Sequence, residues 1–123
     1  MIGHDEGGGG RNKWGFGFIR DALCFHLNGP QVGERWIARH QFTPKLDRWY
    51  HLALTHEANS YKLYVNGECV KTEQNRTAVP DAAADLTIGQ MEGLGISGTL
   101  DELIILDRGL TGEEVEAIYD SQK

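Results

Sequence analysis

The sequence predicts an all-β protein, an antiparallel β-sandwich or barrel with one short C-terminal helix. Apolar residues alternate with polar or small ones over short runs, which is the pattern of half-buried strands. Turn residues separate these runs, and the 123 residues include 16 glycines against 3 prolines, which fits many tight turns. Helical spacing is confined to the last residues, so alternating βαβ units are excluded.

The first third of the chain is expected to hold a flexible loop and then three strands. Residues 1–13 contain four consecutive glycines and show no hydrophobic period. These glycines lack the Lys-Ser/Thr pair of a phosphate-binding loop. The three strands are predicted at Trp14–Phe18, Ala22–Leu27 and Arg35–Gln41. Gly15 and Gly17 share one face of the first strand, and we expect another part of the molecule to pack closely on that face.

The rest of the chain is expected to hold five further strands. Asn66-Gly67 is a strong hairpin signal between two of them. The five are predicted at Trp49–Thr55, Tyr61–Val65, Glu68–Thr72, Leu86–Gly89 and Gly98–Leu106. The helix follows, because Thr111 and Glu114 form a capping box and the apolar stripe is Val115, Ile118 and Tyr119.

Charge and hydropathy exclude several classes of partner. The formal net charge of −6 gives no electrostatic attraction to a phosphate backbone or an anionic membrane. No apolar run approaches the roughly 20 residues that span a bilayer. We therefore expect neither nucleic-acid binding nor membrane insertion.

Two cysteines, Cys24 and Cys69, are too few for a disulfide framework. We expect buried free thiols, because isolated cysteines are often simply buried. A single bridge between them and a reactive thiol are the alternatives that the sequence leaves open.

Five motifs occur in an order that resembles a known superfamily. They are Trp49-Tyr50-His51-Leu52-Ala53-Leu54-Thr55, Tyr61-Lys62-Leu63-Tyr64-Val65-Asn66-Gly67-Glu68, Leu86-Thr87-Ile88-Gly89, Gly98-Thr99-Leu100-Asp101-Glu102-Leu103-Ile104-Ile105-Leu106, and the helical end from Leu110 to Tyr119. Together they resemble the laminin-G-like, concanavalin-A-like jelly rolls. The N-terminal third matches this pattern loosely.

The resemblance implies one laminin-G-like domain over residues 1–123, built as two packed antiparallel sheets. Members of this family usually carry further strands before the position of Ile2, so the domain is expected to be N-terminally truncated relative to the family. An uncovered sheet edge would expose unpaired N–H and C=O groups. We therefore expect a homodimer that completes the sheet, or a fragment whose remaining strands lie elsewhere.

Aromatic residues are the candidate platforms for a sugar, because a ring offers its face to pyranose C–H groups. The candidates are Trp14, Trp36 and Tyr64, and hydrogen bonds are expected from Arg39, His40 and Gln41. For each aromatic, burial in the core is the competing interpretation. Trp49 resembles the family's inward Trp at a strand start and is expected in the core.

Asp101 occupies a position that resembles a ligand of structural calcium in related domains, where carboxylate and carbonyl oxygens bind the cation. Calcium is thus an expected cofactor, although a carboxylate that caps a turn is the alternative. The five histidines are scattered and show no zinc-binding pattern.

The sequence shows no sign of catalysis. Asp101 and Glu102 are neighbours on a predicted strand and would point to opposite faces, so they cannot flank one glycosidic bond. No nucleophile with an orienting base is apparent. The function expected is a carbohydrate-binding or adhesion module, extracellular and part of a larger protein. One alternative is a protein-binding or assembly module with an open sheet edge. Another is a fragment of a glycoside-hydrolase-associated domain with no activity of its own.

Overall fold

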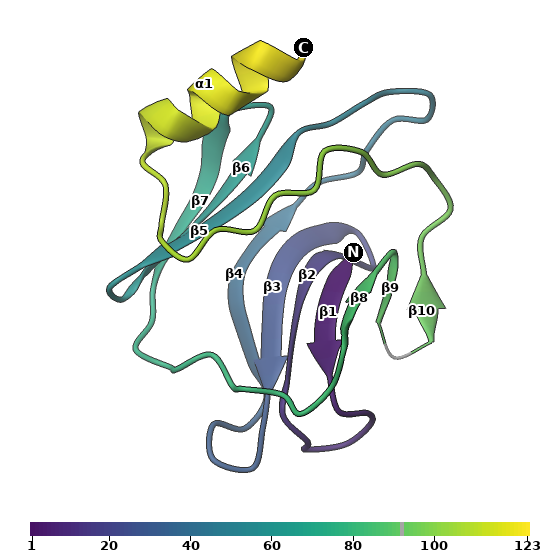
Figure 1. Cartoon of the computed structure of the whole chain (residues 1–123), viewed down its shortest axis with the longest axis vertical. Helices are drawn as coiled ribbons and strands as arrows, with labels where there is room; N and C mark the ends of the chain where they lie inside the picture. Colours follow the sequence, from purple (N-terminus) through teal and green to yellow (C-terminus); the bar gives the residue numbers. More distant parts are fainter. Residues whose placement is uncertain (92) are drawn as a thin grey trace.

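Ten strands and one helix make up the described chain in a computed structural model that describes every residue except 92 (Figure 1). In chain order they are β1 (Ile2–Asp5), β2 (Lys13–Ile19), β3 (Ala22–Asn28), β4 (Arg35–Gln41), β5 (Leu52–Glu57), β6 (Ser60–Val65), β7 (Glu68–Gln74), β8 (Leu86–Ile88), β9 (Gln90–Met91), β10 (Leu94–Gly95) and α1 (Gly112–Gln122).

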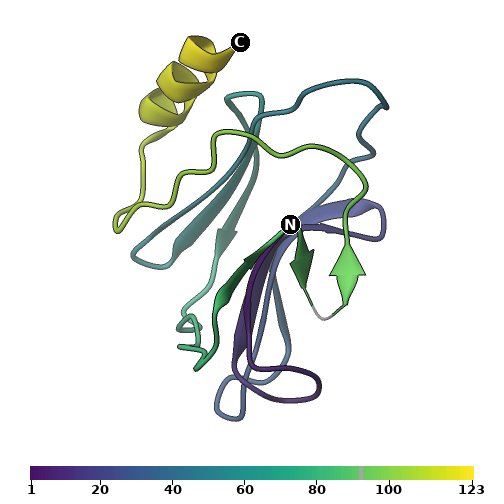
Figure 2. The same ribbon diagram turned by 45° about the vertical axis from the view of Figure 1, so that its right-hand side comes forward.

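Two antiparallel sheets of unequal width form the two layers of the fold (Figure 2). The wider sheet has five strands in the order β4-β3-β2-β1-β8, and the narrower one has three in the order β5-β6-β7. A small β9-β10 hairpin lies beside the wider sheet. The expected all-β sandwich with a C-terminal helix is therefore confirmed.

The core lies between the two sheets. Its buried members come from β3, β4 and β6: Leu23, Phe25, Leu27, Ile37, Ala38, Tyr61 and Leu63. The rings of Phe25 and Tyr61 join the layers, with centroids 5.7 Å apart. Because β3 supplies three of these residues on one face, this strand anchors the core.

The other face of β3 is buried as well, so all six residues from Ala22 to Leu27 are buried. On that outer face, glycines of β1 and β2 lie side by side, with Gly3 opposite Gly15. A Cβ on Gly3 would lie 2.7 Å from Met91 Cγ, and one on Gly15 would overlap Met91 Sδ. Met91 therefore packs directly on the glycine face, and a side chain at Gly3 or Gly15 would occupy the space that Met91 fills.

Most of the predicted elements are confirmed. The strand from Arg35 to Gln41 has the predicted bounds, and Asn66-Gly67 turns the β6-β7 hairpin with φ values of 52° and 80°. Positive φ at both positions is the geometry of a type I′ turn. The predicted strand at Trp49 begins later, at Leu52.

The expected loop over residues 1–13 is wrong at its start. Residues Ile2–Asp5 form β1, which pairs with β2 on one side and β8 on the other. The pairing with β8 spans more than eighty positions in the sequence. A strand of four residues is too short to show a hydrophobic period, and its partner β8 is distant in the sequence. The sequence pattern therefore did not predict β1.

The predicted strand over Gly98–Leu106 is also wrong. These residues belong to no strand, and no backbone–backbone hydrogen bond is present within or from them among the described residues. Five large apolar side chains are exposed as a result: Leu100, Leu103, Ile104, Ile105 and Leu106. The apolar pattern is that of a buried strand, but no strand of the described residues pairs with it.

The helix α1 begins at the predicted cap. Thr111 accepts a hydrogen bond from Glu114 N, and the Glu114 side chain accepts one from Thr111 N. Arg108 donates to both carboxylate oxygens of Glu114 at 2.9 Å. This guanidinium, with the Thr111 amide, lowers the pKa of Glu114 to about 2.

The glycine face gives a first prediction. Gly15→Ala should destabilise the fold by about 1–3 kcal/mol, because the new methyl group collides with Met91. Adding Met91→Ala to Gly15→Ala should cost less than the sum of the two single changes, since the collision is removed. Urea unfolding of the four proteins measures this coupling, and strictly additive effects would contradict the contact.

The capping pair gives a second prediction. The lowered pKa of Glu114 means that its contribution is present above the ordinary value of 4.5 and is lost as the pH falls towards about 2. Glu114→Gln should therefore lower Tm at neutral pH, and the difference from wild type should close over that window. Glu113→Gln is the control, because Glu113 forms no ion pair or hydrogen bond among the described residues. A Tm difference that persisted at pH about 2 would refute the prediction.

Candidate functional site

Three predicted site residues lie together on the outer face of β4, and we call Trp36, Arg39 and Gln41 the outer strip. Strict alternation would separate Trp36 from Arg39. A bulge at Ala38, whose φ is 49°, adds one residue and corrects the phase. Trp36 then lies opposite His26, Arg39 opposite Cys24 and Gln41 opposite Ala22.

Trp36 forms the aromatic end of the outer strip. Its side chain is 47% exposed, so about half of the indole is open to solvent. The ring packs against the imidazole of His26, with centroids 4.4 Å apart and planes at 44°. This contact fixes one face of the indole and leaves part of the ring accessible to a ligand.

His26 is the buried polar residue beneath this aromatic end. It is 7% exposed, and neither ring nitrogen has a hydrogen-bond partner among the described residues. Its Nε2 lies 3.4 Å from Glu34 Oε1, a carboxylate on the segment that leads into β4. Because both ring nitrogens are enclosed, His26 supports the indole of Trp36 and presents no open polar atom of its own.

Arg39 and Gln41 form the polar end of the outer strip. Gln41 Nε2 donates to Asp21 Oδ2 at 3.0 Å, and an Arg39 guanidinium nitrogen lies 3.7 Å from Asp21 Oδ1. Asp21 belongs to the β2–β3 turn. The Arg39 and Asp21 side chains are both more than half exposed, so their pairing leaves donors and an acceptor open to solvent.

The remaining predicted residues do not join this strip. His40 lies opposite Leu23 and therefore belongs to the inner face of β4. Trp14 is half-buried against the core, with its ring near Phe25. Tyr64 is 2% exposed beneath α1. Trp14 and Tyr64 are therefore packed in or against the core, and neither ring forms an exposed platform.

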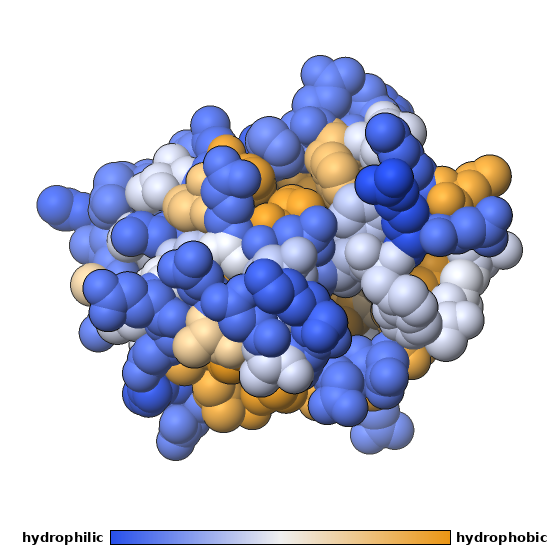
Figure 3. Space-filling model, turned by 90° about the horizontal axis from the view of Figure 1, so that it is seen from above, coloured by the Kyte–Doolittle hydropathy of each residue, from blue (hydrophilic) through white to orange (hydrophobic). Residues whose placement is uncertain are grey.

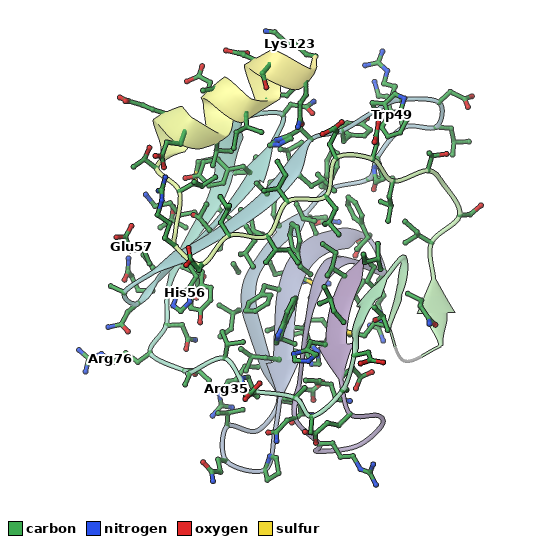
Figure 4. The ribbon with its side chains drawn as sticks, viewed as in Figure 1. Arg35, Trp49, His56, Glu57, Arg76 and Lys123 are labelled. Atoms are coloured by element: carbon green, nitrogen blue, oxygen red, sulfur yellow. The ribbon has the colours of Figure 1, made fainter. Side chains whose placement is uncertain are left out.

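The expectation that Trp49 is a core residue is wrong. Trp49 precedes β5 and is 68% exposed (Figure 4). Leu46, close by in the sequence, is 91% exposed. The segment that holds these residues lies beyond the edge of the narrower sheet, where no described strand covers it.

Asp101 lies on the exposed stretch before α1 and not on a strand. Its Oδ1 accepts a hydrogen bond from the N–H of the next residue, Glu102, at 2.9 Å. Within the described residues, no cluster of three or more His, Cys, Asp or Glu side chains could hold a metal ion. A single carboxylate does not match the 6–8 oxygen ligands that calcium takes, so the side chains present do not fit a calcium site by themselves.

The sequence did not identify His26, Glu34 and Asp21 as members of the site. His26 gave one signal, because it alternates with Cys24 and Ala22 on the face opposite the core residues. Its pairing with Trp36 depends on the register of β3 and β4 and on the bulge. No pattern within one strand carries that information.

Two shallow hollows of the surface lie away from the outer strip. One is lined by the β6-β7 turn and by Glu116, Tyr119, Asp120 and Lys123 around α1. The other lies between residues 30–32 and 78–81. In the described part of the chain, no helix is long and apolar enough to cross a membrane.

The two cysteines are both free thiols. Cys24 is 1% exposed beneath the outer strip, and burial raises the pKa of its thiol. Cys69 is exposed on β7. The expectation of free thiols is confirmed, whereas burial holds for Cys24 alone.

These environments predict two rates of thiol modification. Cys69 should react with a disulfide reagent such as Ellman's reagent within seconds to minutes, whereas Cys24 should react when the protein unfolds. Cys69→Ser isolates the slow thiol, and Cys24→Ser isolates the fast one. Equal rates in the folded protein would show that the outer face of β3 is open.

Comparison with known proteins identifies the fold. Residues 2–116 match the model of a family described as the concanavalin A-like lectin/glucanases superfamily. The crystal structure of an S-layer domain-containing protein (residues 221–444) from Clostridium thermocellum superposes with a TM-score of 0.53 and 20% sequence identity. The superposition covers 97% of this chain and 61% of the solved one. No curated protein matched.

Proposed function

Because this chain belongs to the concanavalin A-like lectin/glucanases superfamily, we propose that it is a non-catalytic module that binds a polysaccharide through the outer strip of β4. The observation that carries the proposal is the half-exposed Trp36, held against His26 on a face that also presents Arg39 and Gln41. Membership of the superfamily favours binding or adhesion, and the outer strip gives that binding a location.

Sugar recognition needs an aromatic platform and directional hydrogen bonds, and the outer strip offers both. The exposed part of Trp36 is available to stack on the C–H face of a pyranose ring. Arg39 and Gln41 supply donors, and Asp21 and Glu34 supply acceptors at the two ends of the strip. Because these groups follow one strand, they favour an extended chain over a small molecule in a closed pocket.

The absence of catalysis is part of the proposal. The neighbouring carboxylates Asp101 and Glu102 lie on an exposed stretch that belongs to no strand, and neither is part of the outer strip. Incubation with the polysaccharide that is bound should release no reducing ends. Any sustained release would refute this part of the proposal.

Two further features are proposed with the same module. The first is an extracellular location, as part of a larger protein, which suits a polysaccharide ligand and an S-layer structural relative. The second is calcium, for which Asp101 is the proposed ligand and which would need several further oxygen ligands. Binding assays with added calcium and with a chelator test the second feature.

The test of the outer strip is Trp36→Ala. Retention on the polysaccharides that bind wild type should weaken by about tenfold or more, which is about 1.4 kcal/mol of binding free energy. Tm should fall, because the indole is half buried and packs on His26, so retention is compared at a temperature where both proteins are folded. Affinity electrophoresis against a panel of soluble polysaccharides, with pull-down on insoluble ones, measures the effect.

Trp49→Ala is the matched control, because it removes another exposed indole, which lies in the connection between β4 and β5 and is not part of the outer strip. It should leave retention unchanged. Failure of the wild-type protein to bind any polysaccharide would refute the glycan proposal. Equal losses in both variants would refute the assignment to the outer strip.

A further inference from the structure

Glu34 carries an exposed carboxylate beside the aromatic end of the outer strip. Its side chain is 60% exposed, and it lies on the segment that leads into β4. Oε1 lies 3.4 Å from Nε2 of His26, whose ring packs on the indole of Trp36. Among the described residues, no lysine or arginine forms an ion pair with this carboxylate. The carboxylate is therefore accessible to a cation that approaches from solvent.

An aromatic ring and a carboxylate at one place are both attractive to an ammonium group. The face of an indole attracts a cation within about 6 Å of the ring centroid. A carboxylate adds a charge-assisted hydrogen bond from the N–H donors of the same cation. Here the carboxylate of Glu34 lies against the ring of His26, and that ring lies 4.4 Å from the ring of Trp36. The aromatic end therefore suits a sugar that carries an ammonium group as well as an apolar C–H face.

The two nearest arginines leave the carboxylate of Glu34 free. Arg39 lies two positions of the strand pair away from Trp36, which is about 7 Å, and its guanidinium is paired with Asp21 at 3.7 Å. Arg35 lies opposite a core residue of β3, so it belongs to the other alternation of β4. Its guanidinium donates to the backbone carbonyl of Glu34 at 3.2 Å. The side-chain charge beside Trp36 therefore remains available to a ligand.

The charge of the whole chain favours a ligand of the same kind. The formal net charge is −6, so the long-range field attracts polycations and repels polyanions. Hydrophilic side chains cover much of the face seen from above, with apolar surface between them (Figure 3). The helix at this end of the molecule, α1, contains no basic residue and four acidic ones, Glu113, Glu114, Glu116 and Asp120. A polysaccharide with uronate groups would meet this field as a like charge.

We propose that the ligand of the outer strip is a polysaccharide with free amino groups, a polymer of 2-amino-2-deoxyhexopyranose units. One unit stacks its C–H face on Trp36, and its ammonium group donates to the carboxylate of Glu34. Farther along the strip, Asp21 offers a second carboxylate to the next units, beside the donors of Arg39, which suit hydroxyl oxygens. This inference rests on the proposed function and adds the chemical class of the polysaccharide.

Three oligosaccharides with one backbone test the amino group. They are the β-1,4-linked hexamers of glucose, N-acetylglucosamine and glucosamine, which carry a hydroxyl, an acetamide and an ammonium group at the same carbon. Isothermal titration calorimetry is carried out at a mildly acidic pH, where the amine is protonated. We expect the glucosamine hexamer to bind about tenfold more tightly than the other two. Added salt should reduce this difference, because the ammonium group pairs with an exposed carboxylate.

Glu34→Gln tests the assigned carboxylate. It should lower the affinity for the glucosamine hexamer about tenfold and thereby remove the preference over the acetamide form. Tm should change little, because the side chain is 60% exposed. Glu57→Gln is the matched control, because it removes the same charge from an exposed position on β5. This control variant should keep the preference for the glucosamine hexamer.

The failure of this inference can be told apart from the failure of the proposed function. Equal affinity for the three hexamers, or tighter binding of polygalacturonate, would overturn the amino-sugar assignment and leave polysaccharide binding in place. So would retention of a neutral polysaccharide without binding of the glucosamine hexamer. Equal losses in Glu34→Gln and Glu57→Gln would also overturn it, because the preference would then come from the charge of the whole chain. No binding of any polysaccharide would refute the proposed function itself.

Discussion

The burial of β3 on both faces is the constraint on which the rest of the structure depends. Its inner residues, Leu23, Phe25 and Leu27, pack against the narrower sheet, and its outer residues, Cys24 and His26, lie beneath the outer strip. A strand buried on both sides must be central, so β2 and β4 pair with it along its length, β4 with one bulge at Ala38. The core and the candidate site are therefore two faces of one strand.

The outer face of the wider sheet differs from one side to the other in the size and exposure of its side chains. Towards β1 and β2 the face is made of glycines, and Met91 covers it closely. Towards β4 the face carries large side chains, and Trp36 stands over His26 with part of its ring in solvent. The glycine side is closed by the chain itself, so the β4 side is where a ligand has access.

Local chemistry determined which parts of the fold were predictable. The Asn66-Gly67 turn, the Arg35–Gln41 strand and the Thr111 cap each depend on a few adjacent residues, and each was confirmed. β1 depends on pairing with β8, which lies far away in the sequence. The sequence also predicted Trp36, Arg39 and Gln41 without showing that they share a face, because the Ala38 bulge depends on the pairing with β3.

The failed strand prediction over Gly98–Leu106 differs from these in its cause. The local pattern is strongly that of a strand, and a strand also needs a partner for its N–H and C=O groups. Among the described residues no partner is in place, so the run stays extended and exposed. A sequence pattern reports the environment that the residues require. Here the described part of the chain does not supply that environment, so these residues keep the sequence pattern of a strand without its hydrogen bonds.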